Sequence, residues 1–235
     1  MQSLHRFHFL SFLLVPIALL WQHPAKHTPS KPLPKRSIAS LWADTQALQE
    51  GDLLFQDLNC GDLCDAIEQV TPDYHGMHFS HVAILHFVDN RWMVLEAYDG
   101  VSIVSLYQFL NRSKDSLGRP LVRVGRLKPA YQGQINLAII NAYGLLGAPY
   151  DDEFLPNNGK YYCSELVHDV FVNDQHDTLF NNRPMTYKRP YEKDFQPTWQ
   201  HYFEGKKQPI PEGVAGINPG LMTKSDKIQM LSLFE

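Results

Sequence analysis

The fold is decided by residues 81–98, which read HVAILHFVDNRWMVLEAY. Two apolar runs rich in β-forming residues, 81–88 and 92–98, flank the pair Asp89-Asn90. Asp and Asn tolerate the left-handed backbone conformation that a tight turn requires, so this pattern predicts a β-hairpin. We take the hairpin as the first fixed element of the fold.

This hairpin predicts a contact between a histidine and a carboxylate. An even-length turn places Tyr98 opposite His81, and Glu96 is then a diagonal neighbour of His81 on the same face. A turn of odd length would reverse the parity of the strand and remove the contact. Glu96 is the only acid in the otherwise apolar run 92–98. A carboxylate buried there needs a partner, which favours the contact with the imidazole.

Residues 163–171, CSELVHDVF, predict a helix with Cys163 at its first turn. Its apolar stripe consists of Leu166, Val167, Val170 and Phe171. At the first turn of such a helix, unpaired N–H groups and the helix dipole favour a thiolate at Cys163. The same N–H groups are suited to receive an oxyanion. The alternative interpretation of Cys163 is a small buried apolar residue, the commonest setting of a free cysteine.

A thiolate nucleophile needs an imidazole, and the imidazole needs a group that orients it. The chain has 11 histidines, so position along the sequence cannot choose among them. The hairpin selects His81 with Glu96. His75, His78 and His81 form a series with spacing of three, but this is not a standard zinc pattern and we predict no metal.

The remaining pattern indicates an α+β domain. Strands are expected at 52–56, 101–105 and 121–126, and helices at 40–48, 61–71, 132–146 and 164–172. The Pro- and Gly-rich stretch 209–219 is expected to lie extended over the body of the domain.

The N-terminus predicts export. Residues 1–22 combine Arg6 with a short apolar run and are interpreted as a signal peptide or N-terminal anchor, with possible membrane association. Residues 23–36 form a Pro/Lys-rich linker, and the folded domain is expected at 37–235. The linker's bases disfavour export of the domain behind it, and no small-residue cleavage site is obvious. A buried N-terminal helix is the alternative.

The charge distribution argues against one class of partner, and the cysteine spacing indicates which cysteines can pair. Residues 1–36 hold five of the 21 bases and no acid, which leaves 16 bases against 25 acids, or −9, on residues 37–235. An acidic body argues against a nucleic-acid partner. Cys60 and Cys64 are four residues apart at an expected loop-to-helix junction, and they can pair only if Cys60 lies in the loop. Cys163 is then the odd thiol.

Five ordered motifs resemble those of the YiiX/YebB-like cysteine hydrolases. They are 51–56 (GDLLFQ), 80–84 (SHVAI), 95–97 (LEA), 146–151 (LGAPYD) and 162–167 (YCSELV). These enzymes are circularly permuted relatives of the NlpC-type papain-like amidases, and the likeness spans about 51–172. It implies a permuted papain-like fold, with an antiparallel sheet packed against helices. The segment around Cys60 and Cys64 lies outside the pattern.

The resemblance also implies a catalytic triad, which falls on Cys163, His81 and Glu96, and it implies no cofactor. Tyr150, in the Pro-Tyr-Asp step, resembles a position that lines the active site, although an ordinary core tyrosine is the alternative. Tyr150 and Tyr162 are the predicted substrate-binding residues.

We therefore expect an exported hydrolase of the periplasm or cell envelope that cleaves an amide bond in a peptide or cell-wall substrate. A lipid-directed thiol acyl hydrolase or acyltransferase is the second hypothesis, with Phe79, Trp92 and Tyr98 as candidates to line an acyl channel. A binding protein that kept the fold without catalysis is the third. The loops 57–59, 111–119 and 174–197 are expected to shape the pocket.

Overall fold

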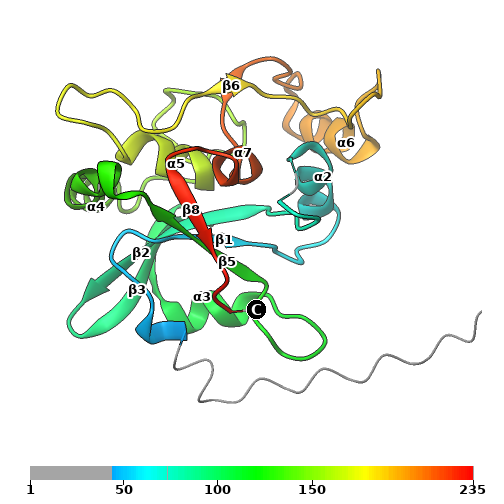
Figure 1. Cartoon of the computed structure of the whole chain (residues 1–235). Helices are drawn as coiled ribbons and strands as arrows, with labels where there is room; N and C mark the ends of the chain where they lie inside the picture. Colours follow the sequence, from blue (N-terminus) through cyan, green and yellow to red (C-terminus); the bar gives the residue numbers. More distant parts are fainter. Residues whose placement is uncertain (1–43, 73, 235) are drawn as a thin grey trace, which may run out of the picture. The chain divides into compact units, whose positions relative to one another are not determined.

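A six-stranded sheet forms the centre of the computed structural model, which describes residues 44–72 and 74–234 (Figure 1). Its strands are β1 (Leu53–Gln56), β2 (His81–Val88), β3 (Arg91–Ala97), β4 (Val101–Ser105), β5 (Val122–Leu127) and β8 (Ile228–Leu231). Their order across the sheet is β4-β3-β2-β1-β5-β8, and each neighbouring pair is antiparallel. The predicted α+β class with an antiparallel sheet is confirmed.

The hairpin β2–β3 has the predicted even-length turn. Asp89 and Asn90 both adopt positive φ, 51° and 58°, as a tight two-residue hairpin turn requires. Ile84 pairs with Leu95 across the two strands. The same register, counted three residues further, places His81 opposite Tyr98.

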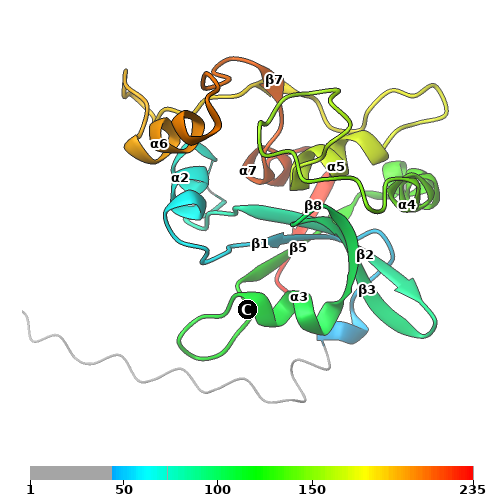
Figure 2. The same cartoon turned by 180° about the vertical axis from the view of Figure 1, so that it is seen from behind.

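Helices cover both faces of the sheet because successive strand residues point to opposite sides. Leu53 and Phe55 of β1 face α4 (Ile135–Gly144) and α5 (Cys163–Val170), whereas Leu54 faces α3 (Leu106–Arg112). Figures 1 and 2 show α4 and α5 on one side of the sheet and α3 on the other. The short helix α7 (Pro219–Thr223) joins the first side through Met222.

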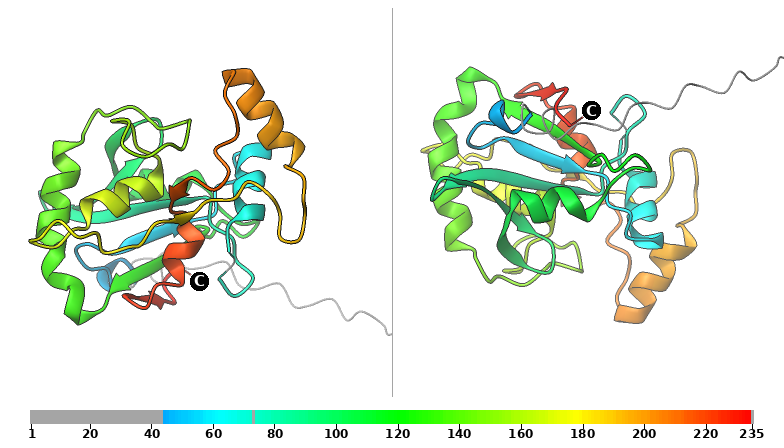
Figure 3. Two further views of the ribbon diagram at one scale, coloured as in Figure 1. Left: turned by 90° about the horizontal axis from the view of Figure 1, so that it is seen from above. Right: turned by 90° about the horizontal axis from the view of Figure 1, so that it is seen from below.

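A third apolar cluster lies beside the sheet, between α2 (Asp62–Val70) and α6 (Pro197–Lys206), which run close together (Figure 3). It is largely aromatic and consists of Ala66, Phe154, Tyr162, Tyr187, Trp199 and Phe203. The two-stranded pair β6 (Arg183–Pro184) and β7 (Ala215–Gly216) adjoins it. We call this group of elements the aromatic lobe.

Cys60 and Cys64 form a disulfide, as their spacing permits. Helix α2 begins at Asp62, so Cys60 lies in the preceding loop, which is the condition the sequence set. The bond therefore ties the entry of the aromatic lobe to its first helix.

Removing this disulfide by the double substitution Cys60→Ser/Cys64→Ser is expected to destabilise the protein by only about 2 kcal/mol. The bond restricts the unfolded chain, and this effect is small because the loop that it closes is very short. Thermal unfolding at equal protein concentration measures the change. The untreated protein in reductant is expected to match the double variant, and an unchanged melting temperature in both would contradict this role.

The sequence patterns did not predict α3, β6, α6, β7, α7 or β8. The helix expected at 132–146 is split into a 3₁₀ segment, Pro129–Gln134, and α4, which ends at Gly144. The stretch 209–219 contains β7 and leads into α7. Of the helix expected at 40–48, residues 44–46 are helical and 40–43 lie outside the described residues.

The expectations for 1–22 and 23–36, and the domain start at 37, lie outside the described residues as well. Among the residues that are described, no helix combines the length and apolar character needed to cross a membrane.

Candidate active site

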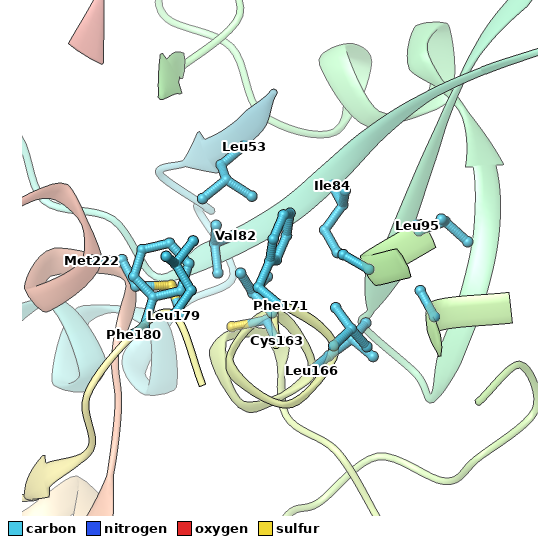
Figure 4. Packing of buried hydrophobic residues seen from close by; sticks show 14 of the residues in the cluster. Leu53, Val82, Ile84, Leu95, Cys163, Leu166, Phe171, Leu179, Phe180 and Met222 are labelled. Atoms are coloured by element: carbon cyan, nitrogen blue, oxygen red, sulfur yellow. The ribbon is translucent and has the colours of Figure 1, made fainter. Parts of the chain in front are cut away.

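Cys163 is the first residue of α5 and so lies in its first turn, as predicted, and Figure 4 shows it where that helix meets β1 and β2. Leu166, Val167 and Val170 of the same helix are fully buried against the sheet, so packing fixes the position of the helix N-terminus. Cys163 is 5% exposed and borders a cavity of about 40 Å³. Cys163 thus packs against the main core cluster and also lines this cavity.

Cys163 lies close enough to His81, the first residue of β2, for each side chain to shift the pKa of the other, and the sulfur is 3.9 Å from the backbone carbonyl oxygen of Ser80. The other side of the imidazole contacts a carboxylate, because His81 Nε2 lies 2.7 Å from Glu96 Oε2. This leaves Nδ1 for the sulfur. The predicted contact between His81 and Glu96 is therefore present, and the hairpin register explains it.

Glu96 is fully buried and carries a second partner, Arg112 of α3. The two guanidinium nitrogens of Arg112 donate to the two carboxylate oxygens, at 2.7 Å to Oε2 and 2.6 Å to Oε1. The Arg112 guanidinium also stacks on the Tyr98 ring, 4.1 Å from its centroid. Tyr98, the residue opposite His81, thus covers the arginine that holds Glu96.

The ionisation of these groups is coupled. Burial raises the pKa of Glu96, but the hydrogen bonds from Arg112 and His81 outweigh it and lower that pKa to about 2. Burial alone would lower the pKa of His81, yet its contacts with Cys163 and Glu96 raise it to about 9. A buried carboxylate and a protonated imidazole are therefore both favoured at neutral pH.

The pKa of the Cys163 thiol moves the other way. Burial raises it, but the hydrogen bond and charge of His81 bring the pKa below the ordinary thiol value. The backbone N–H groups of Val82 and Ser164 add hydrogen bonds to the sulfur. The arrangement favours a thiolate–imidazolium pair, the reactive form of a nucleophilic cysteine.

Tyr150 and Tyr162, the predicted substrate-binding residues, both line the cavity beside Cys163. The Tyr162 hydroxyl accepts a hydrogen bond from the Ile217 N–H at 3.3 Å, so this side chain also holds the segment that leads into α7. The pKa of Tyr150 is raised by burial and by the charge of Cys163. Their role in substrate binding stays a prediction.

The expected acyl channel of Phe79, Trp92 and Tyr98 does not border this cavity. Phe79 is buried in the core beside Phe55, and Trp92 lines a separate groove under α3. The Tyr98 ring packs against His81, with the two ring centroids 5.8 Å apart, and so lies near the candidate site without lining the cavity. Much of the cavity wall comes from the aromatic lobe. Three loops were expected to shape the pocket, and all three lie within the described residues. Of these, only 174–197 lines the cavity, through Met185, Thr186 and Tyr187.

Sequence reasoning missed Arg112, because the pattern of residues 111–119 indicates a loop. A local signal is present nonetheless: Ser105 and Gln108 form a capping box at the start of α3. That pattern, Ser-x-x-Gln after a strand, predicts a helix that carries Arg112 back over the hairpin.

The other histidines near His81 take different places. His75 and His78 are exposed, and His86 is half-buried with its Nδ1 2.5 Å from Glu50 Oε1. Within residues 44–72 and 74–234, no group of three or more His, Cys, Asp or Glu side chains is arranged to hold a metal ion.

Comparison with known proteins shows which family and which solved structure the chain is similar to. The sequence profile of a family described as "Permuted papain-like amidase enzyme, YaeF/YiiX, C92 family" matches residues 47–232. A comparison with curated proteins finds no match. The chain is similar in fold to the crystal structure of the metalloprotein YiiX from Escherichia coli O157:H7, at 21% identity and a TM-score of 0.64 over 79% of this chain and 97% of that one.

The fold, the cysteine at a helix N-terminus and the profile over most of the chain agree with one another. The sequence motifs that suggested a YiiX-like cysteine hydrolase are therefore confirmed in their assignment. The chain belongs to the permuted papain-like amidases of the YaeF/YiiX type, the C92 family, which are cysteine hydrolases.

Proposed function

We propose that this protein is an exported cysteine hydrolase of the cell envelope that cleaves an amide bond in a peptide or cell-wall substrate. The proposal rests on one observation, the series of neighbouring groups Cys163, His81, Glu96 and Arg112: His81 lowers the pKa of the Cys163 thiol, and hydrogen bonds join His81 and Arg112 to Glu96. In this proposal Cys163 is the nucleophile, His81 transfers the protons and Glu96 holds the imidazole. Tyr150 and Tyr162 contact the substrate.

The first half of the reaction forms an acyl-enzyme. The Cys163 thiolate attacks the amide carbon, a C–S bond forms, and the carbonyl electron pair moves onto oxygen. First-turn N–H groups of α5, which lack intrahelical acceptors, stabilise that oxyanion. When the intermediate collapses, the imidazolium of His81 gives its Nδ1 proton to the leaving nitrogen and the C–N bond breaks.

The second half releases the acid. Neutral His81 takes a proton from water, and the water oxygen attacks the thioester carbon. The C–S bond breaks and the electron pair returns to sulfur, which restores the thiolate–imidazolium pair. Throughout, Glu96 Oε2 accepts a hydrogen bond from His81 Nε2–H and so keeps Nδ1 of His81 directed at the sulfur.

Two observations support export. Cys60 and Cys64 are disulfide-bonded, and such bonds persist in oxidising compartments. The basic and apolar start of residues 1–22 is typical of a secretory signal or an anchor. Together they support the periplasmic or cell-envelope location that we propose.

A lipid-directed thiol acyl hydrolase or acyltransferase is the second candidate function, because the cavity wall is mainly apolar and aromatic. The two candidates differ in the acyl group that Cys163 carries during turnover. A third candidate, a binding protein on the same fold, predicts no acyl group at all.

Trapping the acyl-enzyme is expected to separate these functions. The full chain is mixed with cell-wall peptides and with phospholipid vesicles in separate reactions, quenched in acid, and its intact mass is measured. We expect a peptide acyl group on Cys163 that is absent in Cys163→Ala. A fatty acyl adduct alone would favour the lipid enzyme. An unmodified Cys163 in both reactions, in protein that is folded by circular dichroism, would contradict the hydrolase.

A further inference from the structure

The cavity beside the Cys163 sulfur is bordered by two side chains whose polar atoms lack a partner among the described residues. These atoms are the Tyr187 hydroxyl oxygen and Trp199 Nε1. Each side chain is 2% exposed, and the two rings pack edge-on with centroids 4.9 Å apart. Leaving a buried polar group unpaired costs about 1–3 kcal/mol, so two beside one cavity call for an explanation.

Both side chains are held by the aromatic lobe and not by the sheet that carries His81 and Glu96. Trp199 lies on α6, and the backbone N–H of Tyr187 donates to Glu212 at 2.9 Å. The sheet and α5 thus position Cys163, while a separate group of elements positions the two side chains with unpaired hydrogen-bond donors that line the same cavity.

The other residues that line the cavity indicate which kind of ligand group it would bind. None of the described residues that line the cavity is Asp, Glu, Lys, Arg or His, so Cys163 is the one residue of the wall with a readily ionised side chain. Apolar groups such as those of Ile67, Val70 and Ile217 form much of the remainder. An uncharged group with one strong acceptor oxygen suits this wall, and an amide carbonyl is such a group.

An acyl lipid suits this wall less well than a peptide group does. A saturated acyl chain would leave both donors unpaired, whereas a peptide carbonyl satisfies them.

We propose that this cavity is the acyl subsite for a peptide-type group, in which the Tyr187 hydroxyl and the Trp199 indole N–H donate to the carbonyl oxygen next along the acyl chain from the scissile carbonyl. The inference rests on the proposed function and selects the peptide substrate over the acyl lipid. Both atoms are covered in the free protein, so binding has to displace the side chains around them.

A matched pair of achiral p-nitrophenyl esters tests this subsite. N-acetylglycyl and pentanoyl esters have acyl chains of equal length, and only the first has the second carbonyl. The rate at which each acylates Cys163 is measured by p-nitrophenolate release and intact mass, then divided by its rate with N-acetylcysteine to remove intrinsic reactivity. We expect the N-acetylglycyl ester to be favoured by at least about tenfold.

Substitutions at the two donors complete the test. Tyr187→Phe and Trp199→Phe are each expected to remove most of that preference, with the pentanoyl rate changed less than about twofold. Tyr187→Phe is also expected to leave the melting temperature unchanged or higher, because it removes a buried hydroxyl without a partner. If Trp199→Phe does not fold, Tyr187→Phe alone decides the question.

The outcomes distinguish this subsite from the proposed function. No acylation of Cys163 by either ester would overturn the hydrolase itself. Acylation by both esters with equal normalised rates, or a preference that survives in Tyr187→Phe and Trp199→Phe, would overturn the subsite and leave the nucleophile in place.

Discussion

Replacing Cys163 with alanine is expected to lower kcat/KM on a peptide amide by about 10⁴-fold or more, and His81→Ala is expected to cost nearly as much. The reason is that the two side chains act as one unit: without the imidazole the thiol neither ionises fully nor passes a proton to the leaving nitrogen. Groups that act as a unit give strongly non-additive losses. The double variant is therefore expected to be no slower than Cys163→Ala.

His86→Ala is the matched control for this series. His86 lies on the same strand, five residues from His81, and contacts Glu50 instead of the sulfur. Its substitution is expected to leave kcat/KM within about twofold. Losses that simply multiply in the Cys163→Ala/His81→Ala double variant would show that the two residues act independently and would contradict their joint role.

The second large effect is expected at Arg112. Arg112→Met removes both hydrogen bonds from the guanidinium to the buried Glu96 carboxylate, and leaving a buried charge half-paired costs about 3–5 kcal/mol. The shift of the Glu96 pKa from 4.5 to about 2 implies a similar size, about 3 kcal/mol, although Arg112 shares that shift with His81. Urea unfolding at pH 7 measures the loss.

The pH dependence of that loss identifies its source. A carboxyl whose pKa is lowered on folding contributes stability that is present above its unfolded pKa, near 4.5, and is lost as the pH falls toward about 2. The difference between wild type and Arg112→Met is therefore expected to be full at pH 6–7 and to shrink below about pH 4. A difference that stays constant down to pH 3 would assign the loss to packing on Tyr98 instead.

Two further arginine variants serve as controls. Arg112→Lys keeps the charge but not the two parallel hydrogen bonds, and it is expected to recover only part of the stability. Arg119 pairs with Asp115 in the loop that follows α3, and the pair is partly exposed. Arg119→Met is expected to cost less than about 1 kcal/mol.

Local sequence patterns were sufficient for the parts of the site that lie within one hairpin and one helix. The turn Asp89-Asn90 fixed the parity of β2 and β3, and parity alone placed Glu96 beside His81. The apolar stripe of α5 placed Cys163 at the helix N-terminus. Both inferences depend on contacts between residues close in the chain.

The rest of the site is built from contacts distant in sequence, which a local pattern does not specify. Arg112 reaches Glu96 from α3 on the opposite face of the sheet to α5, and Trp199 borders the cavity from α6, far along the chain from Cys163. Strand β8 adds to the sheet edge beside β5, a pairing that no short-range signal announces. The substrate cavity was accordingly less predictable than the nucleophile.

The most direct test of the thiolate–imidazolium pair is the pH dependence of alkylation at Cys163. Among the described residues Cys163 is the free thiol, so iodoacetamide reports on it alone. In the wild type the rate is expected to stay high well below about pH 8.5, the ordinary thiol pKa, whereas in His81→Ala it is expected to rise only near that pH. Identical profiles in the two proteins, both rising near the ordinary thiol pKa, would contradict the pairing of Cys163 with His81.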